Sequence, residues 1–248
     1  MNHTFHIILK DLSRMRWALA IWILCLVYLL FQSRLQLGLD NLGDFLQLSA
    51  IMLSLVAGVG LIADLMQSDH PTLSEAHWRA LPISAGRLVT AKLLLLLGLF
   101  VVLPVGAALV RNLVAENSPF RNLRHLHEIG WALLILGAVN LSYAAVAACT
   151  RNVVHSLGLW LGLIFATGTL ASYLGRYAPV LPREAYVRMG SDKPMAVLTL
   201  SVVIALAVIL NQYLRRRVTA SILLLLAGTV GAALIGTLWG YFYFYSAQ

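Results

Sequence analysis

The side chains that most often carry out chemistry are sparse in this chain and lie far apart. The nearest approach to a metal site is the group His125, His127 and Glu128. Residues two apart do not share a helix face, and a structural zinc site needs four ligands. A metal here would need further ligands from elsewhere. The interpretation we favour is a polar segment that leads into an apolar run.

Sequence motifs for several reactions are absent. The chain has no HExxH, no phosphate-binding GxxxxGK[ST] and no pair of carboxylates within an apolar run. We therefore expect no catalytic residue, metal or cofactor on this chain. No acidic or basic residue lies near the middle of an apolar run. This argues against a self-contained carrier driven by protons or sodium ions.

The elements that hold these residues must be membrane helices. The chain has 248 residues, of which 60% are hydrophobic and 11% are charged, whereas a soluble domain has about 25% charged residues. Its mean hydropathy is +0.83. Continuous apolar runs favour helices over a barrel, whose strands would alternate. The predicted fold class is all-α, a polytopic transmembrane helix bundle.

The apolar runs predict about seven spans within a single transmembrane domain, 1–248. A spanning helix needs roughly 20 apolar residues. The runs that approach this length are 17–32, 45–63, 88–110, 129–150, 154–174, 195–213 and 220–243.

The net charge of +8 does not indicate nucleic acid, because the basic residues are scattered between apolar runs and form no stripe. The positive-inside rule uses such residues to set orientation. With the N-terminus inside, the inner segments hold ten of the 18 Lys and Arg residues and the outer loops hold eight. The triplet Arg215, Arg216 and Arg217 is the strongest inside marker. We expect a cytoplasmic N-terminus and, with seven spans, an outer C-terminus.

The first residues predict an amphipathic helix over 3–15 that lies along the inner membrane surface. Its apolar face would consist of Phe5, Ile8, Leu9, Leu12 and Met15, and Lys10, Asp11 and Arg14 would occupy the other side. The alternative is a frayed polar leader.

The longest inner loop, 64–87, predicts a short helix over 70–81. Thr72 and Glu75 form a capping-box pattern. Pro82 ends the helix, because the residue before a proline is pushed out of the helical region. Ser84 can cap the next span. The alternative is a helix that only rests on the bilayer, with Trp78 at the headgroups.

A few polar and small residues inside the spans are candidates for helix packing. Asn140 can bond to a neighbouring helix, most simply as a structural bond. Gly158 with Gly162, and Gly236 with Gly240, form small-xxx-small patterns that allow helices to approach closely, within the chain or in a dimer.

The inner loop resembles the loop after the second span in type-2 ABC-transporter permeases, the transmembrane subunits of ABC exporters. The shared features are an acidic residue, a Trp, a Pro-Ile-Ser turn and a Lys that opens the third span; here they are Glu75, Trp78, Pro82-Ile83-Ser84 and Lys92. The amphipathic start, ending in Arg14-Met15-Arg16-Trp17, is also similar to that family. So is the segment 212–217, which resembles a subgroup with an added seventh span.

The resemblance implies that the helix 70–81 is a coupling helix, which fits a cleft on a separate cytoplasmic ATPase subunit. The implied docking residues are Glu75, His77, Trp78, Arg79 and Pro82. ATP and Mg would be bound by that partner and not by this chain. The chain would work beside a second permease copy or a homologous permease, surrounded by membrane lipid.

The predicted function is therefore a permease subunit of an ABC transporter, most simply an exporter, in the inner (cytoplasmic) membrane. The substrate is unknown, and apolar spans suit a hydrophobic one. Family members typically have six spans, so either the seventh is genuine or the last two runs do not both cross. The alternative function is a non-transporting membrane anchor or immunity-type subunit. A membrane enzyme would need titratable groups clustered at one depth, and the sequence shows none.

Overall fold

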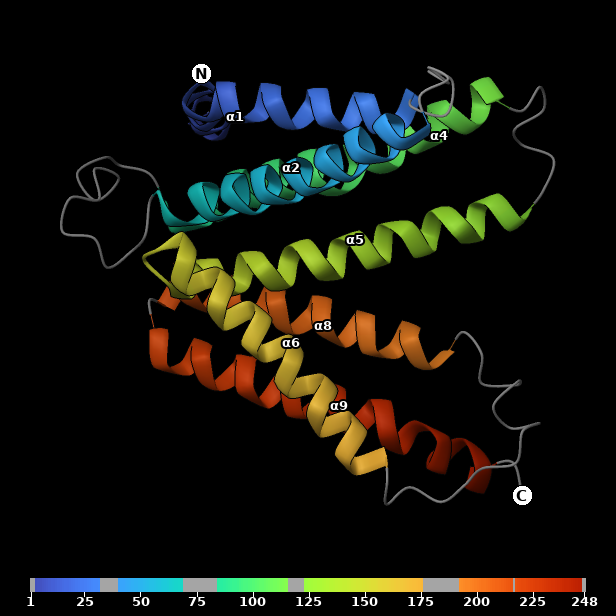
Figure 1. The fold of residues 1–248 in the computed structure, drawn as a ribbon. Helices are drawn as coiled ribbons and strands as arrows, with labels where there is room; N and C mark the ends of the chain where they lie inside the picture. Colours follow the sequence, from blue (N-terminus) through green and yellow to red (C-terminus); the bar gives the residue numbers. More distant parts are fainter. Residues whose placement is uncertain are drawn as a thin grey trace. The chain divides into compact units, whose positions relative to one another are not determined.

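The computed structural model describes residues 3–31, 40–68, 84–115, 123–175, 192–215 and 217–246. These residues are almost entirely helical. The helices are α1 (His3–Phe31), α2 (Asp40–Gln67), α3 (Ala85–Leu97), α4 (Leu103–Ala115), α5 (Leu123–Cys149), α6 (Val153–Gly175), α8 (Asp192–Leu210) and α9 (Val218–Ser246), with π-helical turns η3 (Gly98–Val102) and η4 (Asn211–Arg215) (Figure 1).

Seven helices in the described part of the chain are long and apolar enough to cross a membrane. They are Thr4–Leu29, Leu46–Gln67, Ala85–Val110, Ile129–Cys149, Val153–Tyr173, Met195–Arg215 and Val218–Ile235. The expected all-α fold with about seven membrane-length helices is thus confirmed, and it indicates a multi-pass membrane protein. The third of these helices runs through α3, η3 and α4 without a break.

The chain forms two compact units, 1–140 and 141–248, with α5 passing from one to the other. In the first unit, α1 packs against α2, α3 and α4. Trp22 of α1 stacks at a tilt on Phe100, with ring centroids 5.0 Å apart. A Cβ added at Gly58 of α2 would lie 3.3 Å from the Trp22 Nε1 atom, so the missing side chain lets α1 and α2 approach closely.

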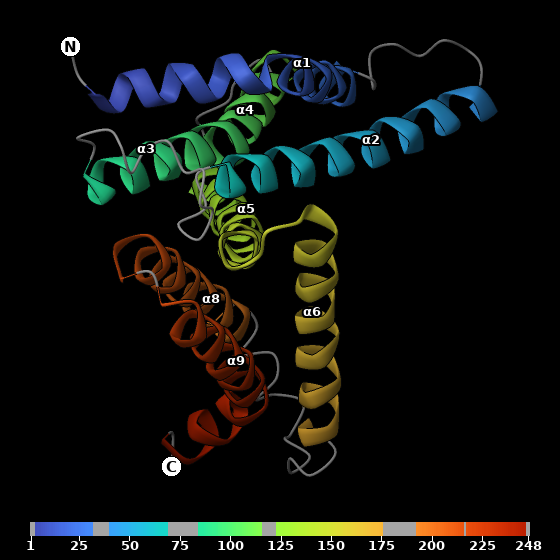
Figure 2. The same cartoon turned by 90° about the vertical axis from the view of Figure 1, so that its left-hand side faces the viewer.

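Helix α1 is continuous from His3 to Phe31, but it changes direction. Its first part is seen end-on in Figure 1 and lengthwise in Figure 2, and the rest of α1 does the reverse. The sequence predicted a helix over 3–15 followed by a separate span. The structure instead joins the two in one bent helix.

The π-helical turn η3 lies within the third membrane-length helix, between α3 and α4. Pro104 follows it and has no backbone N–H to donate to the Phe100 carbonyl, its partner in a regular α-helix. Asn140 of α5 donates to that carbonyl from its Nδ2 atom at 3.0 Å. A side chain from another helix thus satisfies a carbonyl that proline leaves without a donor, as an apolar environment requires.

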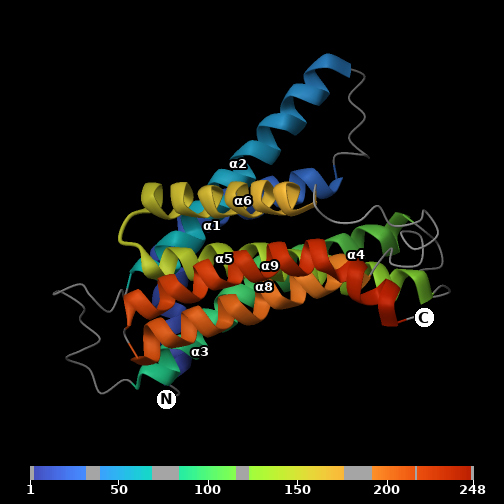
Figure 3. The same cartoon turned by 90° about the horizontal axis from the view of Figure 1, so that it is seen from below.

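In the second unit, α9 packs against both α8 and α6. Helices α8 and α9 lie side by side in Figures 1 and 3. A Cβ at Gly228 would lie 2.7 Å from Ile204 Cδ1, so this glycine sets their closest packing. Asn211 Nδ2 donates to the Arg217 carbonyl and to Ser221 Oγ, at 3.2 and 2.9 Å. These bonds join η4 to the start of α9.

The turn between α5 and α6 is also held by polar side chains. Val154 donates its backbone N–H to Asn152 Oδ1 at 2.9 Å, which caps α6. Tyr143 Oη and Ser156 Oγ are 3.0 Å apart, and Trp160 donates to Ser142 Oγ at 3.1 Å. The Tyr143 and Trp160 rings meet edge to face. The two helices therefore form a braced hairpin.

Candidate functional site

The predicted docking residues Glu75, His77, Trp78, Arg79 and Pro82 lie outside the described residues, as does the predicted helix 70–81. The structure does describe both stems of this loop. The first stem is the end of α2, at Gln67 and Ser68, and the second is the start of α3. Ser84 caps α3, since its Oγ accepts from the Arg87 N–H at 3.4 Å. The expected cap is confirmed.

Lys92 lies seven residues into α3 and is fully buried. Its ammonium group donates to the Leu65 carbonyl and, at 3.0 Å, to Ser68 Oγ. It also forms an ion pair with Asp11 Oδ2 at 3.5 Å. Lys92 therefore joins both stems of the loop and the N-terminal helix at one buried point.

Asp11 of α1 is also fully buried, in a stripe with Ile7 and Met15. These positions are four residues apart, so they share one helix face. Neither carboxylate oxygen accepts a hydrogen bond from the described residues. This carboxylate instead forms an ion pair with the Lys92 ammonium group.

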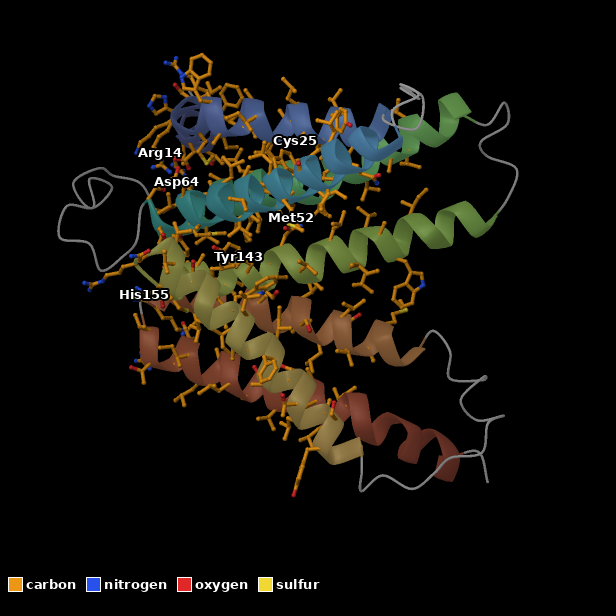
Figure 4. All side chains as sticks on the ribbon, in the orientation of Figure 1. Arg14, Cys25, Met52, Asp64, Tyr143 and His155 are labelled. Atoms are coloured by element: carbon orange, nitrogen blue, oxygen red, sulfur yellow. The ribbon has the colours of Figure 1, made fainter. Side chains whose placement is uncertain are left out.

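Arg14 and Asp64 form a second, exposed link between α1 and the end of α2 (Figure 4). Arg14 Nη2 and Nε lie 3.1 and 3.3 Å from Asp64 Oδ2, and Nη2 also donates to the Asp64 carbonyl at 3.0 Å. The two side chains are 37% and 51% exposed. Water and salt weaken such a pair, and exposed pairs contribute about 0–1 kcal/mol.

The two cations share one electrostatic task. The C-terminal end of a helix carries a partial negative charge, which favours cations beside it. Arg14 donates to the Asp64 carbonyl and Lys92 to the Leu65 carbonyl, both in the last turn of α2; the Ser68 N–H and Oγ also donate to these two carbonyls. We call Asp11, Arg14, Asp64, Ser68 and Lys92 the stem cluster. It anchors the end of α2 to α1 and α3.

The predicted interface-helix residues have mixed surroundings. Phe5 and Leu9 are exposed, Ile8 and Leu12 are half-buried, and Met15 is buried. The prediction that placed Asp11 on the solvated side of this helix is wrong. The buried face follows the four-residue spacing of Ile7, Asp11 and Met15, and Lys92 provides the opposite charge that lets Asp11 join it.

Sequence reasoning missed Asp11 and Lys92 as partners. Lys92 carried a signal, because it lies inside the apolar run 88–110, where a lysine needs a partner. Nothing in the order of residues indicated that the partner would be 81 positions away, in the N-terminal helix.

The glycines predicted for helix packing lie in open positions where the structure describes them. A Cβ at Gly158 or Gly162 of α6 would meet nothing within 4 Å, so neither residue supports a close approach among the described residues. The side chains around Gly236 and Gly240 lie outside the described set. The predicted packing residue Asn140 makes the bond to Phe100 given above and donates to Leu136 O at 2.9 Å.

No cluster of His, Cys, Asp or Glu within the described ranges could hold a metal ion. Comparison of the chain with protein-family models, with curated proteins and with solved structures found no match. The stem cluster is therefore the candidate site on its own geometry. Its contacts hold the end of α2 against α1 and α3.

Proposed function

We propose that this chain is the transmembrane permease subunit of an ABC transporter, most simply an exporter, driven by a separate cytoplasmic ATPase. The observation that supports this best is the stem cluster. It ties the two stems of the 69–83 loop to each other through Lys92 and to the N-terminal helix through Asp11 and Arg14.

Such a cluster suits a loop that transmits force. If a partner pushed on an unbraced loop, the loop would bend and the spans would stay in place. With α2 and α3 joined at a buried point beside the loop, a push displaces both helix ends together. Lys92 makes this joint with its two hydrogen bonds, and a hydrogen bond that involves a charged group contributes about 1.5–3 kcal/mol, so the joint can transmit force.

In this proposal the chain itself performs no ATP chemistry. The full sequence has no GxxxxGK[ST] motif, so ATP and Mg would be bound by the partner. The predicted helix 70–81 would dock on that partner with Glu75, His77, Trp78, Arg79 and Pro82. A second copy of the chain, or a homologous permease, would complete the transport path in the cytoplasmic membrane.

A pulldown from mild detergent tests this proposal. We expect a cytoplasmic ATPase to co-purify with the tagged native chain and to be lost from Trp78→Ala and Glu75→Lys. His125→Ala, on the opposite predicted side, is the control and should retain the ATPase. If no ATPase accompanies any of these chains, transport is abandoned in favour of a non-transporting membrane subunit with a different partner.

A further inference from the structure

The contacts of the stem cluster are unequally divided between the helices. Lys92 of α3 donates two hydrogen bonds at the end of α2, one to the Leu65 carbonyl and one to Oγ of Ser68, the residue after the helix. Asp11 of α1 joins the same point through an ion pair of 3.5 Å, and its oxygens accept no hydrogen bond from the described residues. The α2–α3 joint is thus well satisfied, whereas the α1 contact is not.

This difference has a physical consequence. A buried carboxylate loses its hydration, and attraction to one cation compensates only when hydrogen bonds satisfy the remaining lone pairs. Asp11 lacks those bonds and would regain water on leaving the site. Lys92 would keep both bonds to α2 if α1 moved away. The exposed pair of Arg14 and Asp64 adds little to hold α1, because solvent and salt screen it.

We propose that the first part of α1, residues 3–15, is a releasable arm whose engagement is controlled by the charge of Asp11, while α2 and α3 remain joined through Lys92. When the arm is engaged, α1 moves together with α2, α3 and the loop. When the arm is released, α1 does not move with them. That mechanical consequence rests on the proposed function. The release itself is a property of this chain and is measurable without a partner.

The arm hypothesis makes different predictions from a simple stabilising ion pair. Asp11→Asn removes the buried charge and keeps the shape, so it should favour the engaged arm. Lys92→Met leaves Asp11 buried without a counter-charge, so it should expel the arm. Combining the two removes the stranded charge and should restore engagement. A stabilising pair would instead release the arm in both single variants.

Electron-spin distance measurements on the full chain in lipid nanodiscs distinguish these cases. Spin labels would be placed at Ser13→Cys and Thr90→Cys, which are exposed on α1 and α3. The control pair is Val56→Cys with Thr90→Cys, which reports α2 against α3. Both native cysteines, Cys25 and Cys149, would first be replaced by Ala.

We expect the parent 13–90 pair to show an engaged and a released distance. Asp11→Asn should lower the released-to-engaged ratio at least about threefold, and Lys92→Met should raise it by about a hundredfold. Adding Asp11→Asn to Lys92→Met should reverse that rise. The 56–90 distance should be the same in the parent and in Asp11→Asn.

The proposal is overturned if Asp11→Asn increases the released population, or if, in the parent chain with Lys92 intact, the 56–90 distance lengthens together with the 13–90 distance. A failure here leaves ATPase co-purification untouched, and the loss of co-purification leaves these distances untouched. The arm and the proposed function can therefore fail separately.

Discussion

At the scale of single residues, Lys92 and Asn140 have the same structural role. Each is a polar side chain that donates a hydrogen bond to a backbone carbonyl of another helix, beside a helix end or a proline. Such donors are valuable in an apolar environment, where water cannot replace them. Both residues are therefore better understood as parts of the helix backbone network than as groups that react.

Asn140→Ala should lower the free energy of unfolding by about 1 kcal/mol, the scale of a hydrogen bond between membrane helices. The physical reason is the Phe100 carbonyl, which loses its donor. Thermal unfolding in detergent measures the change. Thr169→Ala is the matched control, because its hydroxyl bonds within its own helix, to the Phe165 carbonyl.

Pro104→Ala sharpens the same test, since alanine supplies the backbone N–H that proline lacks. In that background, Asn140→Ala should cost less than in the native chain. Equal losses in the two backgrounds would contradict the link between Asn140 and the proline.

At the scale of elements, Gly228 controls the α8–α9 pair. A Cβ there would lie 2.7 and 2.8 Å from Cδ1 and Cγ2 of Ile204, whereas a Cβ at Gly231 would meet Leu200 at an ordinary 3.7 Å. Gly228→Ala should therefore destabilise the chain by about 1–3 kcal/mol, the usual cost of overpacking. Thermal unfolding should show Gly231→Ala close to native.

Shortening the opposing side chain provides the decisive control. Ile204→Ala should recover much of the stability that Gly228→Ala loses, because it removes the atoms in the way. If Gly228→Ala is as stable as Gly231→Ala, the close packing of α8 on α9 is contradicted.

The elements themselves could be predicted from the sequence, because a run of about 20 apolar residues has few alternatives to a membrane helix. The Ser84 cap was equally accessible, since capping depends on neighbouring residues. The residues that contact each other between helices could not be predicted from the sequence. The structure has close helix contacts at Gly58 and Gly228 and not at the predicted Gly158 and Gly162. A glycine pattern shows where another helix could approach closely, but it does not show which helices pack together.

The stem cluster shows the same limit. The loop helix was predicted from local spacing and Lys92 was singled out by the family resemblance, but the burial of Asp11 depends on how α1 packs against α2 and α3. A helical wheel for residues 3–15 places the charges on one side and carries no information about a cation 81 positions later.

At the scale of the whole molecule, the proposal of seven crossings with a cytoplasmic N-terminus would place the termini on opposite sides of the membrane. In a chain without native cysteines, Ser13→Cys should resist a membrane-impermeant thiol reagent in intact cells. Ser118→Cys and Ser246→Cys should react. Protection of position 246 together with position 13 would indicate an even number of spans.

The most direct test of the account measures ATP hydrolysis by the co-purified ATPase in lipid vesicles, with the native chain and with Lys92→Met. Lys92 is not part of the proposed docking segment 70–81, so the variant should still bind the ATPase. It should lose most of the stimulation that the native chain gives, because the loop no longer moves α2 and α3 together. Thr90→Ala, whose hydroxyl donates to the Gly86 carbonyl of its own helix, should stimulate as the native chain does. Full stimulation by a folded, ATPase-bound Lys92→Met chain would contradict the account.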